Sequence, residues 1–159
     1  MDELLLDTTY LLPAVGVDIQ LGGFGTDFPK MLERFRVFFN PVSLIEAKWI
    51  ILKACRRERS AEARRRLLER YRTGISALLR DSRLEQTALT SPAVEQVADT
   101  VLVEDGLDDY FDRMIYATAC ERRSVLLTED RELKKLEPTK SGAKPKNVVR
   151  WATVKMTAA

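Results

Sequence analysis

Residues 107–130 read LDDYFDRMIYATACERRSVLLTED. Small and apolar residues recur with helical spacing over 107–122, which predicts a helix, and the apolar run within 124–128 predicts a short buried strand. Each part of this unit has an acidic residue in or near it: Asp112 lies in the helix, and Asp130 stands two residues after the strand. A helix that leads into a buried strand is the repeating unit of α/β proteins.

The rest of the chain repeats this alternation of strands and helices. Strands are predicted at 3–6, 36–40 and 147–154, with an ambiguous further strand at 83–89, and a glycine-rich loop at 16–27. Further helices are predicted at 8–15, 28–35, 43–57, 60–79, 92–100 and 131–136. The pattern predicts an α/β fold with a mostly parallel central sheet flanked by helices on both faces, a three-layer arrangement.

Length and composition set the class of protein. With 159 residues, 45% of them hydrophobic, the chain is expected to form a single domain over 1–159. Cys55 and Cys120 have no CxxC spacing, which favours free thiols in a reducing compartment. No apolar stretch has the length of a membrane span, so we expect a cytoplasmic protein.

The charged residues are unevenly distributed although their totals, 26 basic and 24 acidic, nearly cancel. Residues 53–72 contain nine basic and three acidic residues, and Arg64, Arg65 and Arg66 are consecutive. Beside an acidic pocket, such a surface would suit an anionic polymer, and these three arginines are the candidate residues for binding it. The alternative is a solvated helix face with ordinary ion pairs.

The chain contains no histidine. This excludes a Ser-His-Asp site, a Cys-His site and a His-ligated zinc site. Four acids instead stand where apolar runs end or helices begin, namely Asp7, Glu46, Asp112 and Asp130. Carboxylate oxygens are the ligands that Mg²⁺ and Mn²⁺ prefer, so this set predicts a site for one of these ions.

Each acid also has a structural interpretation. Asp7 and Asp130 could cap the helices that follow them, and Glu46 stands three residues after Ser43, as in a capping box. Asp112 lies in a first helical turn, where the helix dipole favours negative charge. Ligand sites in parallel sheets lie outside the carboxyl ends of the strands. Carboxylates gathered there would repel one another unless a cation lay between them, which favours the metal interpretation.

Three segments together resemble the PIN-domain family of metal-dependent ribonucleases: LLLDTT, PVSLIEAKW and residues 107–130. The resemblance covers about 4–154, in the family's order. It implies that Asp7, Glu46, Asp112 and Asp130 are both the catalytic residues and the metal ligands. It also implies supporting roles for the hydroxyls of Thr8 and Thr128 and for Asp109, a spare acid near Asp112.

The activity implied by the resemblance is endoribonuclease cleavage of single-stranded or structured RNA with Mg²⁺ or Mn²⁺. The products would carry a 5′-phosphate and a 3′-hydroxyl. The alternative is a catalytically silent PIN-like module that binds RNA or a protein. A third interpretation, a phosphatase or phosphoacceptor built on Asp7, usually needs a second aspartate at the position of Thr9.

The resemblance also implies partners. Proteins of this size in the family commonly form homodimers, and many bacterial and archaeal members are VapC-like toxins that pair with an antitoxin protein. The arginine-rich segment 53–80 is longer than a compact toxin requires, which leaves open a housekeeping nuclease, an RNA clamp or a partner-docking surface. The apolar residues of this segment predict more buried surface than a small sheet can cover. These residues are Leu67, Leu68, Tyr71, Ile75 and Leu78.

Overall fold

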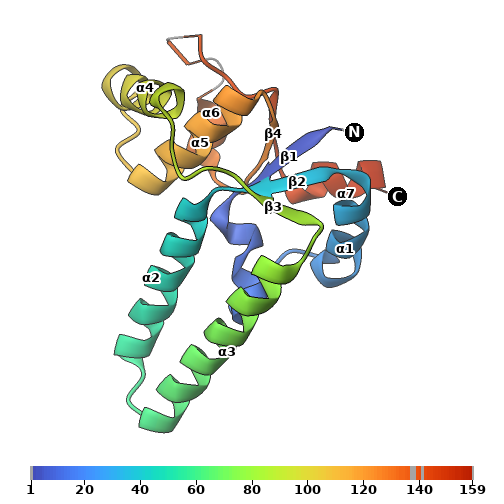
Figure 1. The fold of residues 1–159 in the computed structure, drawn as a ribbon, viewed down its shortest axis with the longest axis vertical. Helices are drawn as coiled ribbons and strands as arrows, with labels where there is room; N and C mark the ends of the chain where they lie inside the picture. Colours follow the sequence, from blue (N-terminus) through green and yellow to red (C-terminus); the bar gives the residue numbers. More distant parts are fainter. Residues whose placement is uncertain (1, 137–138, 141, 159) are drawn as a thin grey trace.

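The structure is a computed structural model that describes residues 2–136, 139–140 and 142–158. These residues form a parallel sheet with the strand order β3-β2-β1-β4-β5 (Figure 1). The central strand β1 pairs with β2 on one side and β4 on the other, so that Leu6 lies opposite Phe39 and Leu127. The predicted parallel sheet is confirmed. Its strands are β1 (Glu3–Leu6), β2 (Arg36–Phe39), β3 (Leu84–Gln86), β4 (Val125–Leu127) and β5 (Asn147–Val149).

Helices connect the strands. The α-helices are α1 (Phe24–Arg34), α2 (Pro41–Arg57), α3 (Ala61–Arg80), α4 (Pro92–Thr100), α5 (Tyr110–Arg122), α6 (Arg131–Lys135) and α7 (Trp151–Ala158). Two 3₁₀ helices, η1 (Thr8–Tyr10) and η2 (Leu12–Val15), follow β1, and a π-helical turn, η3 (Val101–Asp105), follows α4. None of the described helices has the length and apolar character needed to cross a membrane.

Both faces of the sheet are covered, because successive strand residues point to opposite sides. Leu5 and Leu126 point into a core completed by apolar residues of α4, α5 and α6. Leu4 and Leu6 point into a second core, which η1, α1, α7 and the end of α3 complete. The sheet is buried on both sides as predicted, and this explains why its central strands are continuous apolar runs.

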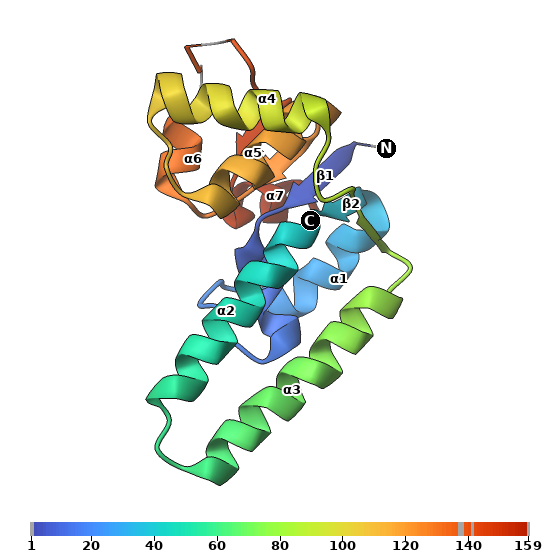
Figure 2. The ribbon, with the colours of Figure 1, turned by 60° about the vertical axis from the view of Figure 1, so that its left-hand side comes forward.

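The long helices α2 and α3 form an arm that projects beyond the sheet (Figures 1 and 2). A third core holds the arm together and joins it to η2, with Val15, Ala47, Ile51 and Cys55 at its centre. Leu67, Tyr71 and Ile75 of α3 pack against this core. The apolar face of α3 therefore packs on α2 and η2 beyond the sheet, so most of the additional buried surface predicted from the sequence lies within the chain, while Leu68 remains 43% exposed.

A glycine sets the distance between α3 and the body of the protein. Gly74 is buried in α3, and a Cβ atom added to it would lie 1.8 Å from the carbonyl oxygen of Ala14 in η2. No side chain fits at that distance. The close approach of the arm to the segment that follows β1 therefore depends on this glycine.

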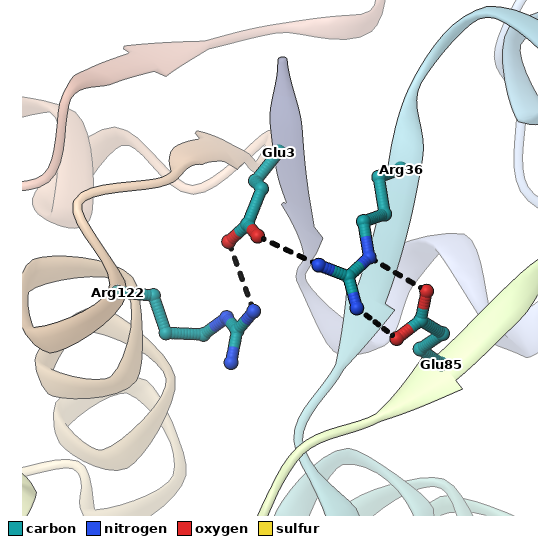
Figure 3. A network of polar contacts seen from close by, with 4 residues as sticks. All are labelled: Glu3, Arg36, Glu85 and Arg122. Carbon is teal, nitrogen blue, oxygen red and sulfur yellow. Dashed lines mark hydrogen bonds and ion pairs between the residues drawn. The ribbon is translucent and has the colours of Figure 1, made fainter. Parts of the chain in front are cut away.

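Ion pairs join the strands near the amino end of the sheet (Figure 3). Arg36 of β2 pairs with Glu3 of β1 at 3.3 Å and with Glu85 of β3 at 2.8 Å. Arg122, the last residue of α5, pairs with the same Glu3 at 2.9 Å. Its guanidinium carbon lies over the ring of Phe38, 3.8 Å from the ring centroid. These cations neutralise acids at the end of the sheet that lies away from Asp7.

Two predicted boundaries near the start of the chain are wrong. Segment 8–15 forms η1 and η2 in place of one α-helix, because Pro13 has no N–H with which to continue an α-helical ladder. The helix expected at 28–35 begins earlier, at Phe24, inside the predicted glycine-rich loop. Phe24 is buried because its ring stacks on that of Phe28, with 4.5 Å between the ring centroids, and lies against that of Trp151, with 5.0 Å between the centroids. These contacts anchor the first turn of the helix.

Three further boundaries differ from the prediction. Helix α2 begins at Pro41 and not at Ser43, because the side chain of Asn40 accepts a hydrogen bond from Val42 N at 2.8 Å and caps the helix. Helix α5 begins at Tyr110 and not at 107. The strand expected at 147–154 ends at Val149, opposite the last residue of β4, and α7 follows it.

Candidate metal and active site

The site lies where the direction of the sheet reverses. From β1 the chain builds β2 and β3 on one side and then crosses to build β4 and β5 on the other. The carboxyl ends of β1 and β4 are therefore adjacent, the position where ligands bind in open α/β sheets. Asp7 follows β1, and its backbone N–H donates to Leu127 O at 3.0 Å. Asp130 stands three residues after that strand partner.

Asp7 is the most buried acid of the site, with 6% of its surface exposed. Its Oδ1 accepts a hydrogen bond from Thr8 N at 2.6 Å and its Oδ2 accepts one from Thr128 Oγ1 at 2.7 Å. Burial raises the pKa of Asp7 to about 6, and the charges of Glu46 and Asp130 add to the rise. The two hydrogen bonds lower the pKa but do not offset the burial.

Thr128 links the two strand-end acids. Its hydroxyl donates to Asp7 and accepts from the backbone N–H of Asp130 at 3.0 Å. Asp130 caps α6 by accepting from Glu132 N at 2.5 Å and Leu133 N at 3.2 Å. The capping role considered for Asp130 is therefore present, and the same carboxylate stands on the wall of a pocket beside Asp7.

Glu46 reaches the site from the second turn of α2. Because Asn40 caps this helix, Ser43 lies inside it, and the capping box proposed for Ser43 and Glu46 is absent. Burial raises the pKa of Glu46, and the charge of Asp109 adds to the rise. The Thr8 hydroxyl lowers this pKa, although its buried oxygen has no hydrogen-bond partner of ordinary geometry in the described part of the chain.

Asp112 reaches the site from the first turn of α5. Asp109 caps this helix by accepting from Phe111 N at 2.9 Å and Asp112 N at 3.1 Å. Burial raises the pKa of Asp112 to about 7, with further contributions from the charges of Asp7, Asp109, Asp130 and Glu46. The mutual repulsion expected from the sequence is thus present around Asp112.

The four acids face one pocket of about 350 Å³. Among the described residues that line it, none is lysine or arginine, so no side chain of the protein neutralises these carboxylates at the pocket wall. As the side chains stand, no group of three or more acids or cysteines among the described residues is placed to hold a metal ion. Mg²⁺ usually keeps several waters and binds through one or two carboxylates, so this oxygen donor set fits such an ion. The pocket is lined by Asp7, Thr8, Thr9, Leu12, Glu46, Ile50, Asp112, Glu129 and Asp130.

One acid of the pocket was missed from the sequence. Glu129 lines the pocket, and its Oε1 accepts from the Tyr10 hydroxyl at 2.7 Å and from Trp151 N at 2.8 Å. Tyr10 comes from η1 and Trp151 from α7, so Glu129 joins the segments that follow three different strands. The position of Glu129 between Thr128 and Asp130 was the available sequence signal. One of its two hydrogen-bond partners, Trp151, belongs to α7, a segment that the sequence predicted to be part of a strand.

The structure places the three candidate RNA-binding arginines away from this pocket. Arg64, Arg65 and Arg66 are exposed in the first turns of α3, near the far end of the arm (Figure 2). Arg65 pairs with Glu69 at 2.8 Å, and Arg66 pairs with Glu62. These surface pairs are the ones expected for a solvated helix, and they do not prevent contact with a polyanion, because exposed pairs of this kind are weak.

We expect the pocket to make the metal-free protein less stable as the pH rises. The pKa values of Asp7 and Asp112, about 6 and about 7, lie above the unfolded value near 4, so the folded state binds more protons in this range. The contribution of these two carboxyl groups to the free energy of unfolding is fully present below their pKa in the unfolded chain. It is lost as the pH rises through their folded-state pKa values of about 6 and about 7. Thermal melting in a chelator between pH 5.5 and 8 measures the loss.

The variant Asp7→Asn tests the cause of this loss. Removing the charge should raise the unfolding free energy at pH 8 by about 1–2 kcal/mol and flatten its pH dependence. The matched control is Asp99→Asn, on the exposed side of α4. An Asp7→Asn protein whose stability falls with pH as steeply as that of the wild type would contradict the assignment of the repulsion to this pocket.

Comparisons with known proteins locate the fold. Neither a protein-family model nor a curated protein matches the sequence. Among solved structures, the chain is similar to one of VapBC2 from Rickettsia felis bound to a DNA fragment from the promoter, with 16% identity and a TM-score of 0.58. It is also similar to VapBC-5 from Mycobacterium tuberculosis, a member of the VapBC family of toxin-antitoxin systems, with 17% identity and a TM-score of 0.53.

Both matches extend over nearly the whole molecule, since each covers 94% of this chain and 98% of the other. The five parallel strands, their order and the flanking helices are those of a PIN domain. The fold predicted from the three acidic segments is therefore confirmed. At these identities the likeness concerns the fold alone.

Proposed function

We propose that this chain is an endoribonuclease that hydrolyses phosphodiester bonds of RNA with the help of Mg²⁺ or Mn²⁺. The observation that carries the proposal is the convergence of Asp7, Glu46, Asp112 and Asp130, from four separate elements, on one pocket without a neutralising lysine or arginine among its described residues. Collecting uncompensated acids is costly for stability, and a divalent cation offsets this cost.

Each acid has a distinct position in this proposal. Glu46 and Asp112 are half-buried, as is Asp130, and they would hold the ion directly together with Asp7, the buried acid of the pocket. Thr128 orients Asp7 through a hydrogen bond of 2.7 Å. Asp130 or Asp7 would accept the proton of the attacking water. A bound divalent ion would supply the activation of that water and the neutralisation of charge on the phosphate.

A cleavage assay tests the proposal. Single-stranded RNA is incubated with the purified chain, with and without Mn²⁺, and the product ends are identified. The proposal expects metal-dependent products with a 5′-phosphate and a 3′-hydroxyl, because a water is the nucleophile. A cyclic phosphate would indicate attack by the RNA 2′-hydroxyl instead. RNA binding without any cleavage in Mn²⁺ or Mg²⁺ would favour the catalytically silent module.

We expect the arginines of α3 to contribute to RNA binding through phosphates. Reversal of Arg64, Arg65 and Arg66 to glutamate should weaken binding of single-stranded RNA by about tenfold or more. Each lost phosphate contact should also lower the salt slope of binding by about 0.7. Titrations at several salt concentrations measure both quantities. Metal binding at the distant carboxylates should not change.

A single-charge comparison makes this test specific. Arg64 has no ion pair within the described residues, so Arg64→Glu changes the charge without breaking a pair. Lys144→Glu makes the same change near the start of β5. An equal effect of the two variants would mean that only net charge matters, and the arginines of α3 would then be a solvated face.

A protein partner is also part of the proposal. The matched structures are of VapBC toxin-antitoxin systems, so we propose that this chain acts as a toxin inhibited by an antitoxin protein. A homodimer follows from the family resemblance, without further support from α3, whose apolar face is largely covered. Expression of the chain without an antitoxin should slow the growth of the cells that produce it, and Asp7→Asn should abolish this slowing. A harmless active enzyme that is monomeric in solution would contradict both the toxin and the dimer.

A further inference from the structure

The exposed side of α2 continues outward from the carboxylate pocket. Glu46 and Ile50 line the pocket, and Lys53 and Arg57 follow them at spacings of three and four residues, so all four lie along one side of the helix. Lys53 and Arg57 are exposed. Since a helix rises 1.5 Å per residue, this line extends roughly 16 Å from Glu46 to Arg57.

An exposed tryptophan lies beside this line. Trp49 is 65% exposed and is three residues after Glu46 and four before Lys53, so it is a neighbour of both on the helix surface. Ile45 and Leu52 extend the apolar surface next to it, with 44% and 38% of their surfaces exposed. The chain's second tryptophan, Trp151, is by contrast 3% exposed within the core.

The charge of this helix is one-sided. Between 47 and 57 the sequence contains four basic residues and no acid. No ion pair within the described chain involves any of these four, which are Lys48, Lys53, Arg56 and Arg57. An aromatic ring beside unpaired cations is the combination that binds single-stranded nucleic acids, because bases stack on the ring and phosphates contact the cations.

We propose that α2 is a binding track for a single RNA strand that leaves the carboxylate pocket, with a base stacked on Trp49 and the backbone on Lys53 and Arg57. The inference rests on the proposed ribonuclease function and adds the path that the RNA strand takes from the pocket. The enzyme would act on RNA that is unpaired next to the cleavage site, because a base within a duplex cannot stack on Trp49. An apolar protein surface alone would not need the unpaired cations.

Tryptophan fluorescence tests this track without relying on cleavage. Single-stranded RNA is titrated into the full chain carrying Asp112→Asn, so that no RNA is cut during the measurement. Emission from the exposed Trp49 should be quenched as RNA binds, and Trp49→Ala in the same background should abolish the quenching, since Trp151 is buried. Affinity measured with labelled RNA should fall about tenfold in Trp49→Ala and much less in Trp49→Phe, which keeps a ring.

Two comparisons make the test specific. Lys53→Glu with Arg57→Glu should weaken binding and lower its salt slope by about one unit or more, as expected for lost phosphate contacts. Leu68→Ala, which removes a comparable exposed apolar side chain from α3, should leave the affinity unchanged. A blunt-ended RNA duplex, which has no unpaired bases, should bind without quenching Trp49.

Failure of the track and failure of the nuclease are distinguishable. If RNA quenches Trp49 and Trp49→Ala weakens RNA binding, but the wild type does not cleave RNA, the binding track is supported and the proposed ribonuclease function is overturned. Wild-type cleavage with unchanged RNA affinity in Trp49→Ala would overturn the track and leave the nuclease. Loss of self-association in Trp49→Ala, without a change in RNA affinity, would likewise overturn it and assign this face to a second copy of the chain.

Discussion

Asp112→Asn should lower RNA cleavage at least about 100-fold, since even residues that only orient metal ligands typically contribute 10- to 100-fold. Asp112 is placed in the pocket by α5, and its pKa of about 7 reflects burial and the surrounding acids. The amide keeps the size of the side chain and removes the charge that a divalent ion needs. Initial rates with labelled single-stranded RNA in Mn²⁺ measure the loss, and Asp7→Asn and Asp130→Asn should give losses of similar size.

The loss of cleavage in Asp112→Asn should not come from unfolding of the protein. Thermal melting should show Asp112→Asn to be at least as stable as the wild type in chelator, because repulsion among the acids is relieved. Asp99→Asn, with the same chemical change on exposed α4, should cleave at the wild-type rate. Cleavage by Asp112→Asn at the wild-type rate would show that the metal site lies elsewhere. Glu46→Gln should lose activity but little stability, since the capping box is absent.

Gly74→Ala should lower the unfolding free energy by about 3 kcal/mol or more, an effect at the upper end of those seen for overpacked cores. The added methyl group would lie 1.8 Å from Ala14 O and 2.6 Å from Ala14 C, and both are backbone atoms that no rotamer change can move. Helix α3 would have to withdraw from η2 and open the core around Val15 and Ile51. For a chain of this length the melting temperature should fall by roughly 10 °C.

A second glycine provides the control for this prediction. Gly25 lies within α1, and a Cβ atom there would meet nothing within 4 Å. Gly25→Ala should therefore stabilise the protein by about 0.5–1 kcal/mol through helix propensity. If Gly74→Ala melted within about one degree of the wild type, the close contact between α3 and η2 would not exist in solution.

Several features of the fold could be predicted because they depend on local chemistry. The apolar runs ending at Leu6 and Leu127 are strands because they are buried on both faces, and Ser60 and Ser91 cap α3 and α4 through side-chain hydrogen bonds. The boundaries that were wrong depend on distant partners. Trp151 belongs to a helix because the short partner β4 ends the strand pairing at Val149.

The sequence by itself determined which chemistry is open to this protein. The absence of histidine and the acids at Asp7, Glu46, Asp112 and Asp130 point to hard-metal chemistry whatever the fold, because ligand preference depends on atom type. Only the tertiary structure decided that these acids share one pocket. Asp7 and Asp130 are 123 positions apart in the chain, and they meet because β1 and β4 are neighbours in the sheet. The same long-range packing brought Glu129 and the exposed side of α2 to the pocket, since proximity across a sheet depends on strand order and not on distance along the chain.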